Sequence, residues 1–398
     1  MAPGARRNTE RVNLSERIAS RIRREGPISF ADFQEMALYE EPDGFFASGG
    51  GAGRAGRDFV TSPEVGSLFG MLVARYLDKV WQKLGAPDPF VVVEAGAGRG
   101  RLAADVLRAS PACAPALRYV LVERSARLRD EQRERLTLEP ADEALGPFVH
   151  GADADDAPQS VPGTGPIVSS LDTVPAISFD GVVIANELLD NLPVHIVERA
   201  ADGWCEVRVA LDDATFVETL VPAPPELSKE ADHVAGNVDA PAGARVPVTQ
   251  AIRGWLERAA TMLRRGEVLI VDYADETDGL IQRGSEWLRT YAAHDRGTAP
   301  LVAPGMQDIT CDVPLGYLRS AAARAGFAVT SETTQVDWLR DLGIDELVAE
   351  GTAIWNEGAA KGDLEAIAGR SRAVEAAALT DRSGLGAHKV LTLERRIA

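Results

Sequence analysis

The sequence has few cysteines and no long hydrophobic run. Cys113, Cys205 and Cys311 lie far apart and form no C-x-x-C pair. This spacing indicates neither a disulfide framework nor a zinc knuckle, and we expect reduced thiols in a cytoplasmic protein. The longest apolar runs, such as 90–93 and 268–271, have the length of buried strands. They fall far short of the roughly 18 residues that a membrane span needs.

Basic side chains are also in deficit. The 398 residues include 60 acidic and 42 basic ones, a formal net charge of -18. Because affinity for nucleic acid depends largely on Lys and Arg that neutralise phosphates, this balance disfavours a DNA or RNA partner. An acidic surface instead suits a cationic molecule or a basic protein segment. The five histidines show no paired ligand spacing, so we expect no metal site.

The N-terminal 24 residues are rich in Arg and Ala, as organelle presequences are. Acidic residues interrupt them, however, and Leu14, Ile18 and Ile22 repeat at helical spacing. We therefore interpret this segment as a tail that leads into an amphipathic helix.

The middle of the chain alternates strands with helices. We predict strands at 90–95, 118–123, 166–170, 181–185 and 267–272. A helix is expected after the fourth of them. This alternation predicts an α/β fold with a mostly parallel, doubly wound sheet.

The flanking segments suggest a division into parts. Residues 1–85 read as a helical extension with a glycine-rich lid loop at 42–57 and one helix over 63–84. Residues 86–195 form the ligand-binding core, 196–246 an insertion, and 247–398 the rest of the core with a helical insertion on the substrate side. Within the insertion we expect antiparallel strands over 196–221 and a surface excursion over 222–246.

A glycine-rich turn follows the first core strand, at Glu94 and then Gly96, Gly98 and Gly100. Such a turn lets the backbone approach a ligand closely, and its amides favour a carboxylate or phosphate. In the dinucleotide fingerprint the third glycine comes three residues after the second, where this chain has Arg101. The G-x-G-x-G spacing instead matches the turn that holds the amino-acid end of S-adenosylmethionine (SAM). The alternative, a merely tight turn, accounts poorly for three alternating glycines.

An acidic residue, Glu123, closes the next strand, 23 residues after Gly100. An acid at such a position receives the ribose hydroxyls in nucleotide-binding α/β folds. Leu171 and Asp172, after the third strand, are predicted to bind the cofactor as well. Together these features favour SAM over other nucleotide ligands.

A polar cluster follows the fourth strand, in the run N-E-L-L-D-N-L-P over 186–193. The carboxyl ends of strands face the ligand crevice in open α/β sheets, so we expect Asn186, Glu187 and Asp190 beside the methyl group. The alternative is that the polar residues cap a helix, which accounts equally well for Asp190 and Asn191 but less well for Glu187. The run differs from the N/D-P-P-Y/F tetrad of enzymes that methylate base amino groups or glutamine amides, which again disfavours nucleic acid.

With these motifs, the chain resembles the MidA-like methyltransferases, a family that includes the mitochondrial complex I assembly methyltransferase. The D-F-x-T-S-P-E stretch from Asp58 and the N-E-x-x-D-x-L-P stretch from Asn186 are specific. The matching segments follow in order over nearly the whole chain: 38–39, 44–46, 57–64, 94–100, 185–194, 272–273, 288–291 with His294, 305–310 and 389–391.

The resemblance implies a class I methyltransferase core, Rossmann-like and doubly wound, with an N-terminal helical extension. It also implies SAM as methyl donor and, as in the mitochondrial members, methylation of an arginine on a complex I subunit. Departures from the family pattern, at Ala274, 284–287 and 311–314, lie late in the chain and concern the acceptor site. Carried over by position, the residues at the cofactor and target site are Asp58, Thr61, Gly96, Gly98, Glu123, Asn186 and Glu187.

The expected reaction is direct transfer of the SAM methyl group to a nitrogen. An arginine acceptor is charged at ordinary pH, so a carboxylate must hold its guanidinium and help its proton leave. We predict Glu187 in that role beside Asn186, with Asp58 or Asp190 as second acid. Two alternatives stay open: a methyltransferase of a small metabolite or natural product, and a non-catalytic SAM-binding assembly factor. The sequence also leaves open the acceptor, the number of methyl groups and the oligomeric state, a homodimer included.

Overall fold

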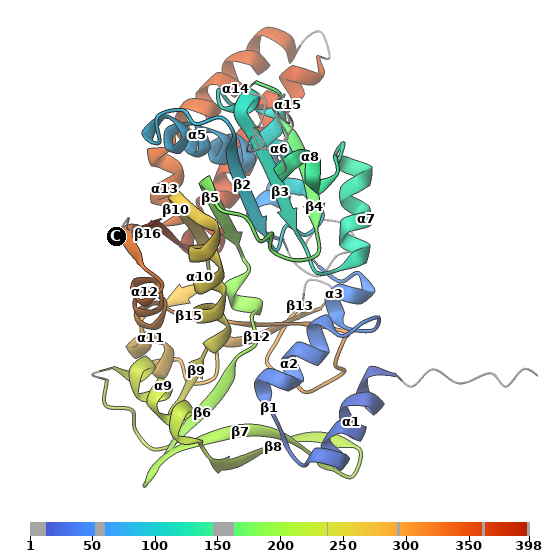
Figure 1. Cartoon of the computed structure of the whole chain (residues 1–398), viewed down its shortest axis with the longest axis vertical. Coiled ribbons are helices and arrows are strands. Elements are labelled where there is room, and N and C mark those ends of the chain that lie inside the picture. Colours follow the sequence, from blue (N-terminus) through green and yellow to red (C-terminus); the bar gives the residue numbers. More distant parts are fainter. Residues whose placement is uncertain are drawn as a thin grey trace, which may run out of the picture.

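The computed structural model describes residues 13–51, 60–145, 163–236, 238–292, 295–359 and 363–395. Its central element is a seven-stranded sheet in the order β16-β17-β10-β5-β2-β3-β4 (Figure 1). The predicted doubly wound α/β fold is therefore confirmed. The strands are β2 (Phe90–Ala95), β3 (Leu117–Val122), β4 (Ile167–Leu171), β5 (Phe179–Asn186), β10 (Leu263–Asp272), β16 (Phe327–Thr334) and β17 (Lys389–Arg395).

The sheet grows outward from β2 in both directions. Strands β3 and β4 add on one side of β2, and β5 and β10 on the other, all in parallel. Val93 of β2 pairs with Val120 on one side and Val183 on the other. Strand β17 then pairs antiparallel with β10, and β16 with β17. Because the order reverses between β2 and β5, a ligand crevice is expected beyond their carboxyl ends.

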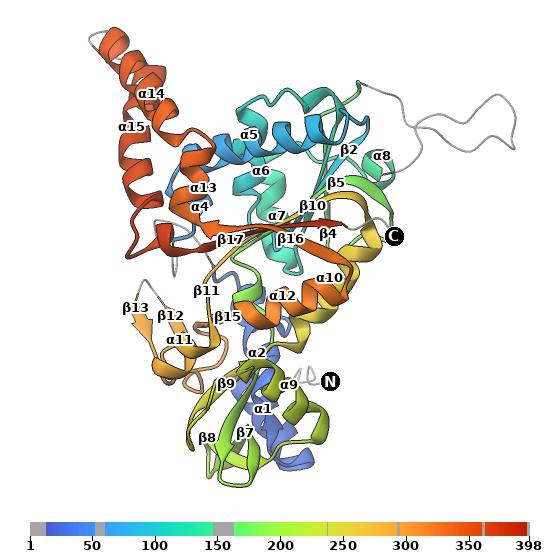
Figure 2. The ribbon, with the colours of Figure 1, turned by 90° about the vertical axis from the view of Figure 1, so that its left-hand side faces the viewer.

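Helices cover both faces of this sheet, and every residue of β2 is buried, as parallel sheets require. One face packs against α5 (Ser67–Lys83), α6 (Arg101–Arg108) and α13 (Gln335–Asp341), the other against α10 (Gln250–Met262) and α12 (Leu315–Arg324). A hairpin of α14 (Ile344–Gly358) and α15 (Leu364–Leu379) projects beside α13 (Figure 2).

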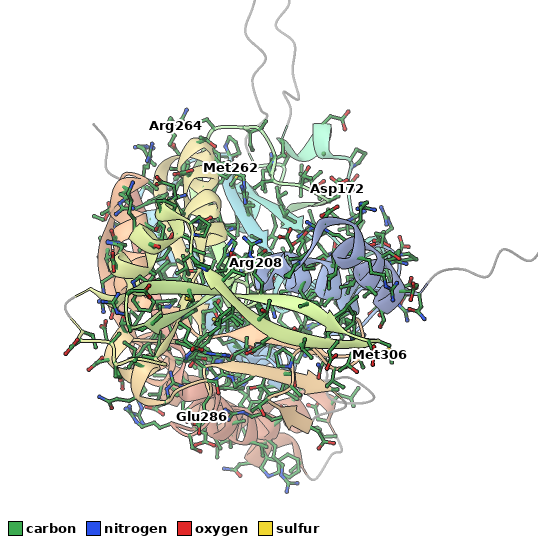
Figure 3. All side chains as sticks on the ribbon, turned by 90° about the horizontal axis from the view of Figure 1, so that it is seen from below. Asp172, Arg208, Met262, Arg264, Glu286 and Met306 are labelled. Atoms are coloured by element: carbon green, nitrogen blue, oxygen red, sulfur yellow. The ribbon has the colours of Figure 1, made fainter. Side chains whose placement is uncertain are left out.

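An antiparallel sheet lies at the end of the molecule opposite α14 and α15 (Figure 1). Its strands are β1 (Ile28–Ser29), β6 (His195–Ala200), β7 (Gly203–Asp212), β8 (Thr215–Pro222) and β9 (Arg245–Val248). Figure 3 shows this layer from below, with Arg208 of β7 labelled. Helices α1 (Leu14–Glu25) and α2 (Phe30–Tyr39) share an apolar core with it, which includes Ile18, Phe33 and Val207. The N-terminal helices and the inserted strands, far apart in sequence, thus stabilise each other.

The remaining elements complete the connections. They are α3 (Phe45–Ser48), α4 (Ser62–Val65), α7 (Ala126–Arg135), α8 (Ala141–Leu145), α9 (Pro225–Ala235), α11 (Thr277–Gln282), β11 (Ala274–Asp275), β12 (Leu288–Ala292), β13 (Asp295–Gly297), β14 (Asp308–Cys311), β15 (Val313–Pro314) and the 3-10 turns η1 (Ala114–Ala116), η2 (Leu189–Asn191) and η4 (Leu385–Ala387).

Among the helices of the described ranges, none has the length and apolar character that a membrane span requires.

Several local predictions were wrong. The single helix expected over 63–84 is broken at Gly66, which adopts extended backbone between α4 and α5. The helix expected after the fourth strand is only the turn η2. Segment 222–246 contains α9 and β9, and the loop at 42–57 contains α3. The domain boundaries after residues 85, 195 and 246 stay predictions.

Candidate functional site

A cavity of about 590 Å³ opens where the strand order of the central sheet reverses. A volume of this size suits a small-molecule ligand or cofactor. The turns after β2, β3, β4 and β5 contribute to its walls, so the carboxyl ends of four parallel strands meet there. Among the residues predicted from sequence, it is lined by Thr61, Glu94, Gly96, Gly98, Glu123, Asp172, Asn186 and Glu187.

The glycine turn after β2 is held by hydrogen bonds within the protein. Gly96 and Gly98 have φ of 68° and 51°, a region that glycine adopts at little cost. The amides of Gly96 and Ala97 donate to the carbonyl oxygen of Val122 at 2.9 and 3.1 Å, and the Gly98 amide donates to Glu123 at 3.0 Å. These amides therefore already have partners within the protein, whereas the glycine spacing predicted that they would bind a ligand carboxylate or phosphate. Gly98 contributes space instead, because a Cβ there would meet nothing within 4 Å.

Glu123 is buried directly after β3 and faces the cavity. One carboxylate oxygen accepts from the Gly98 amide and the other from the Ser125 amide, at 3.0 and 2.8 Å. Burial raises the pKa of Glu123, while these two hydrogen bonds lower it. A carboxylate can accept about four hydrogen bonds, so Glu123 keeps acceptor capacity for two ribose hydroxyls.

Of three other residues predicted to bind the cofactor, one lines the cavity and two do not. Asp172 follows β4 and lines the cavity. Leu171 and Gly100 do not line it: the Leu171 carbonyl accepts from the Glu123 amide at 2.9 Å, and the Gly100 amide donates to Ala97 at 2.9 Å. These two residues therefore lie outside the cavity and form backbone hydrogen bonds to residues that line it.

Glu94, at the end of β2, is buried and lines the cavity. Its carboxylate accepts from the Tyr119 hydroxyl at 2.8 Å. Burial raises the pKa of Glu94 to about 8, and the nearby charge of Glu123 adds to the rise. Glu94 therefore takes up a proton readily in the folded protein.

Glu187 follows β5 with a strained φ of 50°. Its carboxylate accepts from the Ser62 amide at 3.2 Å and from the Asn186 side chain at 3.4 Å. Burial raises the pKa of Glu187 to about 8, with Asp190 and Asp308 adding to the rise. In the described part of the chain, no Lys, Arg or His forms an ion pair with this carboxylate. The cavity thus presents a half-buried acid without a positive partner among the described residues.

Asp190 lies close behind Glu187, fully enclosed and outside the cavity lining. Burial raises the pKa of Asp190 to about 7, although Arg289 opposes the rise. Arg289 is itself engaged, since it pairs with Asp312 and lies over the Tyr273 ring at 4.8 Å. The environment of Glu187 is therefore acidic.

Asp272, the last residue of β10, fixes the chain that follows Glu187. Its carboxylate accepts from the amides of Leu188 and Leu189 at 3.2 and 2.8 Å, and from the Tyr273 amide at 2.9 Å. The turn η2 ends at Leu192, which adopts extended backbone because a proline follows it. Asp190 and Asn191 lie inside η2 and Leu188 occupies its N-cap position, so the helix-cap interpretation of these two residues fails.

Aromatic side chains that sequence reasoning did not assign to the site form another wall. Tyr39 stacks on Phe46 with ring centroids 5.5 Å apart, and both line the cavity. Arg124 lies over the Tyr39 ring at 4.3 Å, and the Ser125 hydroxyl donates to the Phe46 carbonyl at 2.8 Å. Trp255 of α10 also lines the cavity.

Two predicted residues, Asp58 and His294, lie outside the described residues. Across the ranges that the structure describes, no group of three or more His, Cys, Asp or Glu side chains could hold a metal ion.

Comparisons with known proteins agree with this geometry. Residues 72–333 match a family model described as "Putative S-adenosyl-L-methionine-dependent methyltransferase". The chain is 30% identical over 347 residues to the mitochondrial protein arginine methyltransferase NDUFAF7 of Danio rerio, an alignment that covers 84% of this chain and 77% of that protein. The Homo sapiens protein of the same name is 30% identical over 339 residues, with 82% and 72% covered.

Among solved structures, one from Burkholderia thailandensis bound to S-adenosyl-homocysteine (SAH) is similar over almost the whole chain. The TM-score is 0.78 at 30% identity, and the match covers 96% of this chain and 92% of that one. A second structure from the same organism, described as a native crystal structure, has a TM-score of 0.76 at 28% identity.

Proposed function

Because this chain belongs to the MidA-like family of SAM-dependent methyltransferases, we propose that it methylates a side-chain nitrogen of a protein, with arginine as the acceptor. The single observation that carries this choice of acceptor is the half-buried Glu187 carboxylate in the cavity, which forms no ion pair with a described Lys, Arg or His. The relatives named above are protein arginine methyltransferases, and the family resemblance implies a complex I subunit as the partner.

The cavity residues fit SAM as the methyl donor. Gly98 leaves open space beside the turn, Glu123 presents free acceptor capacity for the ribose, and Asp172 lies at the end of the next strand. Thr61 and Asn186 complete the proposed contacts. When bound, SAM supplies an electrophilic methyl group on its sulfonium.

Glu187 would hold the acceptor. A guanidinium is cationic, so it would give this carboxylate the positive partner that a buried charge requires. The same positive charge lowers the pKa of the carboxyl group and favours its ionised form. As the acceptor nitrogen gains the methyl group it loses a proton, and the ionised Glu187 carboxylate that holds the guanidinium is suited to accept it. Asp190, directly behind, is the proposed second acid.

The acceptor is proposed to be a basic protein segment, because the net charge of -18 attracts cations and repels nucleic acid. The proposal also includes a cytoplasmic location. The three cysteines are unpaired thiols, which agrees with a reducing compartment.

The test compares Glu187→Gln with a matched exposed change, Glu257→Gln on α10. Calorimetry with SAH should give dissociation constants within about threefold of the parent for both variants, since neither change touches the glycine turn. Transfer of labelled methyl from SAM to cell-extract protein should fall by at least about 100-fold in Glu187→Gln only.

Undiminished transfer in Glu187→Gln would contradict the assignment of this residue. Label in the small-molecule fraction would instead indicate a metabolite acceptor. Binding of SAH without any labelled product would support a non-catalytic assembly factor.

A further inference from the structure

Ser62 connects the candidate site to helix α13, which is distant from it in the sequence. It is the first residue of α4 and is fully buried. Its backbone amide donates to Glu187 at 3.2 Å, while its hydroxyl donates to the side-chain oxygen of Gln335 at 2.9 Å. Neither Ser62 nor Gln335 lines the cavity. A single residue therefore contacts Glu187 through its backbone and a distant helix through its side chain.

Gln335 is anchored so that its oxygen faces Ser62. It is the first residue of α13 and is also fully buried. Its side-chain NH₂ donates to the carbonyl oxygen of Leu379, the last residue of α15, at 3.0 Å. Its backbone amide donates to the carbonyl oxygen of His388 at 2.8 Å. Since a glutamine side chain offers one acceptor oxygen and one donor nitrogen, the bond to Leu379 leaves the oxygen for Ser62.

Helix α4 cannot hold the Ser62 amide in place by itself. It has only four residues, its preceding residue Thr61 makes no side-chain capping bond, and Gly66 ends it in extended backbone. Helices this short are not stable alone and take their position from tertiary contacts. The hydroxyl bond to Gln335 is such a contact, made by the same residue whose amide meets Glu187.

We propose that Gln335 is a positioning residue that aims the Ser62 amide at the Glu187 carboxylate. This inference rests on the function proposed for Glu187. Without Gln335, the Ser62 hydroxyl would lose its partner and α4 could shift. Glu187 would then keep only the longer contact to Asn186.

The consequence can be measured on Glu187 itself. The Ser62 amide lowers the pKa of Glu187, against burial and the charges of Asp190 and Asp308. Asp272 and Tyr273 also face Glu187 electrostatically. Weakening one hydrogen bond to the ionised form should therefore raise the pKa of Glu187 by about one unit, a tenfold change in its proton affinity.

The experiment is an NMR titration of the full chain labelled with [¹³Cδ]glutamate, without acceptor. The Glu187 signal is identified by its absence in Glu187→Gln. The variants are Ser62→Ala, Gln335→Met and the double variant. Each single change should raise the pKa of Glu187 by a similar amount, and the double change should add little, because both remove the same contact.

Thr334→Ala is the matched control. Thr334 caps the same helix and accepts from the Asp337 amide at 3.4 Å, so its loss weakens α13 without removing the Ser62 bond. It should leave the Glu187 titration unchanged. An equal shift in Thr334→Ala would overturn the proposal, and so would an unshifted titration in folded Ser62→Ala.

If Gln335→Met fails to fold, the comparison of Glu187 titrations in Ser62→Ala and Thr334→Ala is sufficient to test the proposal. The titration needs no methyl acceptor, so it can succeed or fail independently of the transfer assay. If the Glu187 titration shifts in Ser62→Ala while Glu187→Gln still transfers methyl groups, the positioning role of Gln335 is supported and the proposed function of Glu187 is refuted.

Discussion

Glu123 and Glu187 border the same cavity but have different hydrogen-bond partners. Glu123 accepts two short bonds from backbone amides, which fix its orientation and favour its ionised form. Glu187 accepts two longer bonds and has acidic neighbours, so burial dominates its protonation. The first carboxylate is suited to receive neutral hydroxyls, the second to exchange a proton with a cation.

This difference predicts the pH dependence of transfer. Glu187 acts in its ionised form, and its raised pKa means that the carboxyl group is only about half ionised at pH 8 in the free protein. The ratio kcat/KM, which reports the free enzyme, should therefore rise with pH to half its maximum near 8 and level off above about 9. A bound guanidinium lowers the pKa of Glu187, so kcat should level off at a lower pH. Initial rates measured between pH 6 and 9.5 check this. If kcat and kcat/KM show the same dependence on pH, the result contradicts a cationic acceptor.

Gly98 gives a second prediction at this scale. Gly98→Ala would place a side chain in the open space beside the turn, at a positive φ. We expect the dissociation constant of SAH, measured by calorimetry, to rise by at least about tenfold, or roughly 1.4 kcal/mol. Gly236→Ala is the control, since Gly236 also has a positive φ with no neighbour near its Cβ and lies at the end of α9. Similar losses in both variants would mean that backbone strain, and not the cavity, is responsible.

Among the elements, the short helix α3 and the end of α2 add an aromatic wall to a cavity that is also lined by strand ends and by residues of α4, α6 and α10. Phe46 stacks on Tyr39 there, and its carbonyl is bonded to Ser125 beside Glu123. This bond ties the wall to the proposed ribose site. Helices α2 and α3 therefore contribute to the binding site as well as to the apolar core shared with the antiparallel sheet.

Phe46→Ala should weaken SAH binding about tenfold, because an aromatic contact and its buried area are lost. Phe216→Ala removes a comparable contact, to Phe33 at 5.7 Å, in the core away from the cavity. It should lower the melting temperature and leave SAH affinity unchanged. Calorimetry and thermal denaturation of both variants separate the two effects, and unchanged affinity in Phe46→Ala would show that this wall does not touch the ligand.

For the whole molecule, the net charge of -18 should govern the encounter with a basic acceptor. We expect kcat/KM for methylation of an arginine-containing basic protein to fall by about tenfold between 50 and 500 mM NaCl, as the Debye length shortens. SAH affinity should change little, because SAH has no net charge to steer. A salt-independent kcat/KM would indicate a neutral acceptor.

Local patterns were enough to predict the five parallel strands of the central sheet and several residues that line the cavity. The apolar run of β2, the alternating glycines and Glu123 lie within short stretches, and a strand, a tight turn and a strand-ending acid each have a local signature. The same logic failed after β5. The run from Leu188 has helical composition, but it forms only the turn η2 and becomes extended at Leu192, before Pro193, while Asp272 on another strand fixes its first amides.

By itself the sequence determined the five parallel strands of the central sheet, the glycine turn and the acids that end the strands, because each depends on neighbours along the chain. Tertiary structure alone decided that Ser62, Gln335 and Leu379 form one line of contacts to Glu187, and that Phe46 borders the ligand cavity. Their hydrogen bonds and packing join residues from opposite ends of the chain. No periodicity or spacing encodes such contacts, because they exist only once the separate elements have packed together.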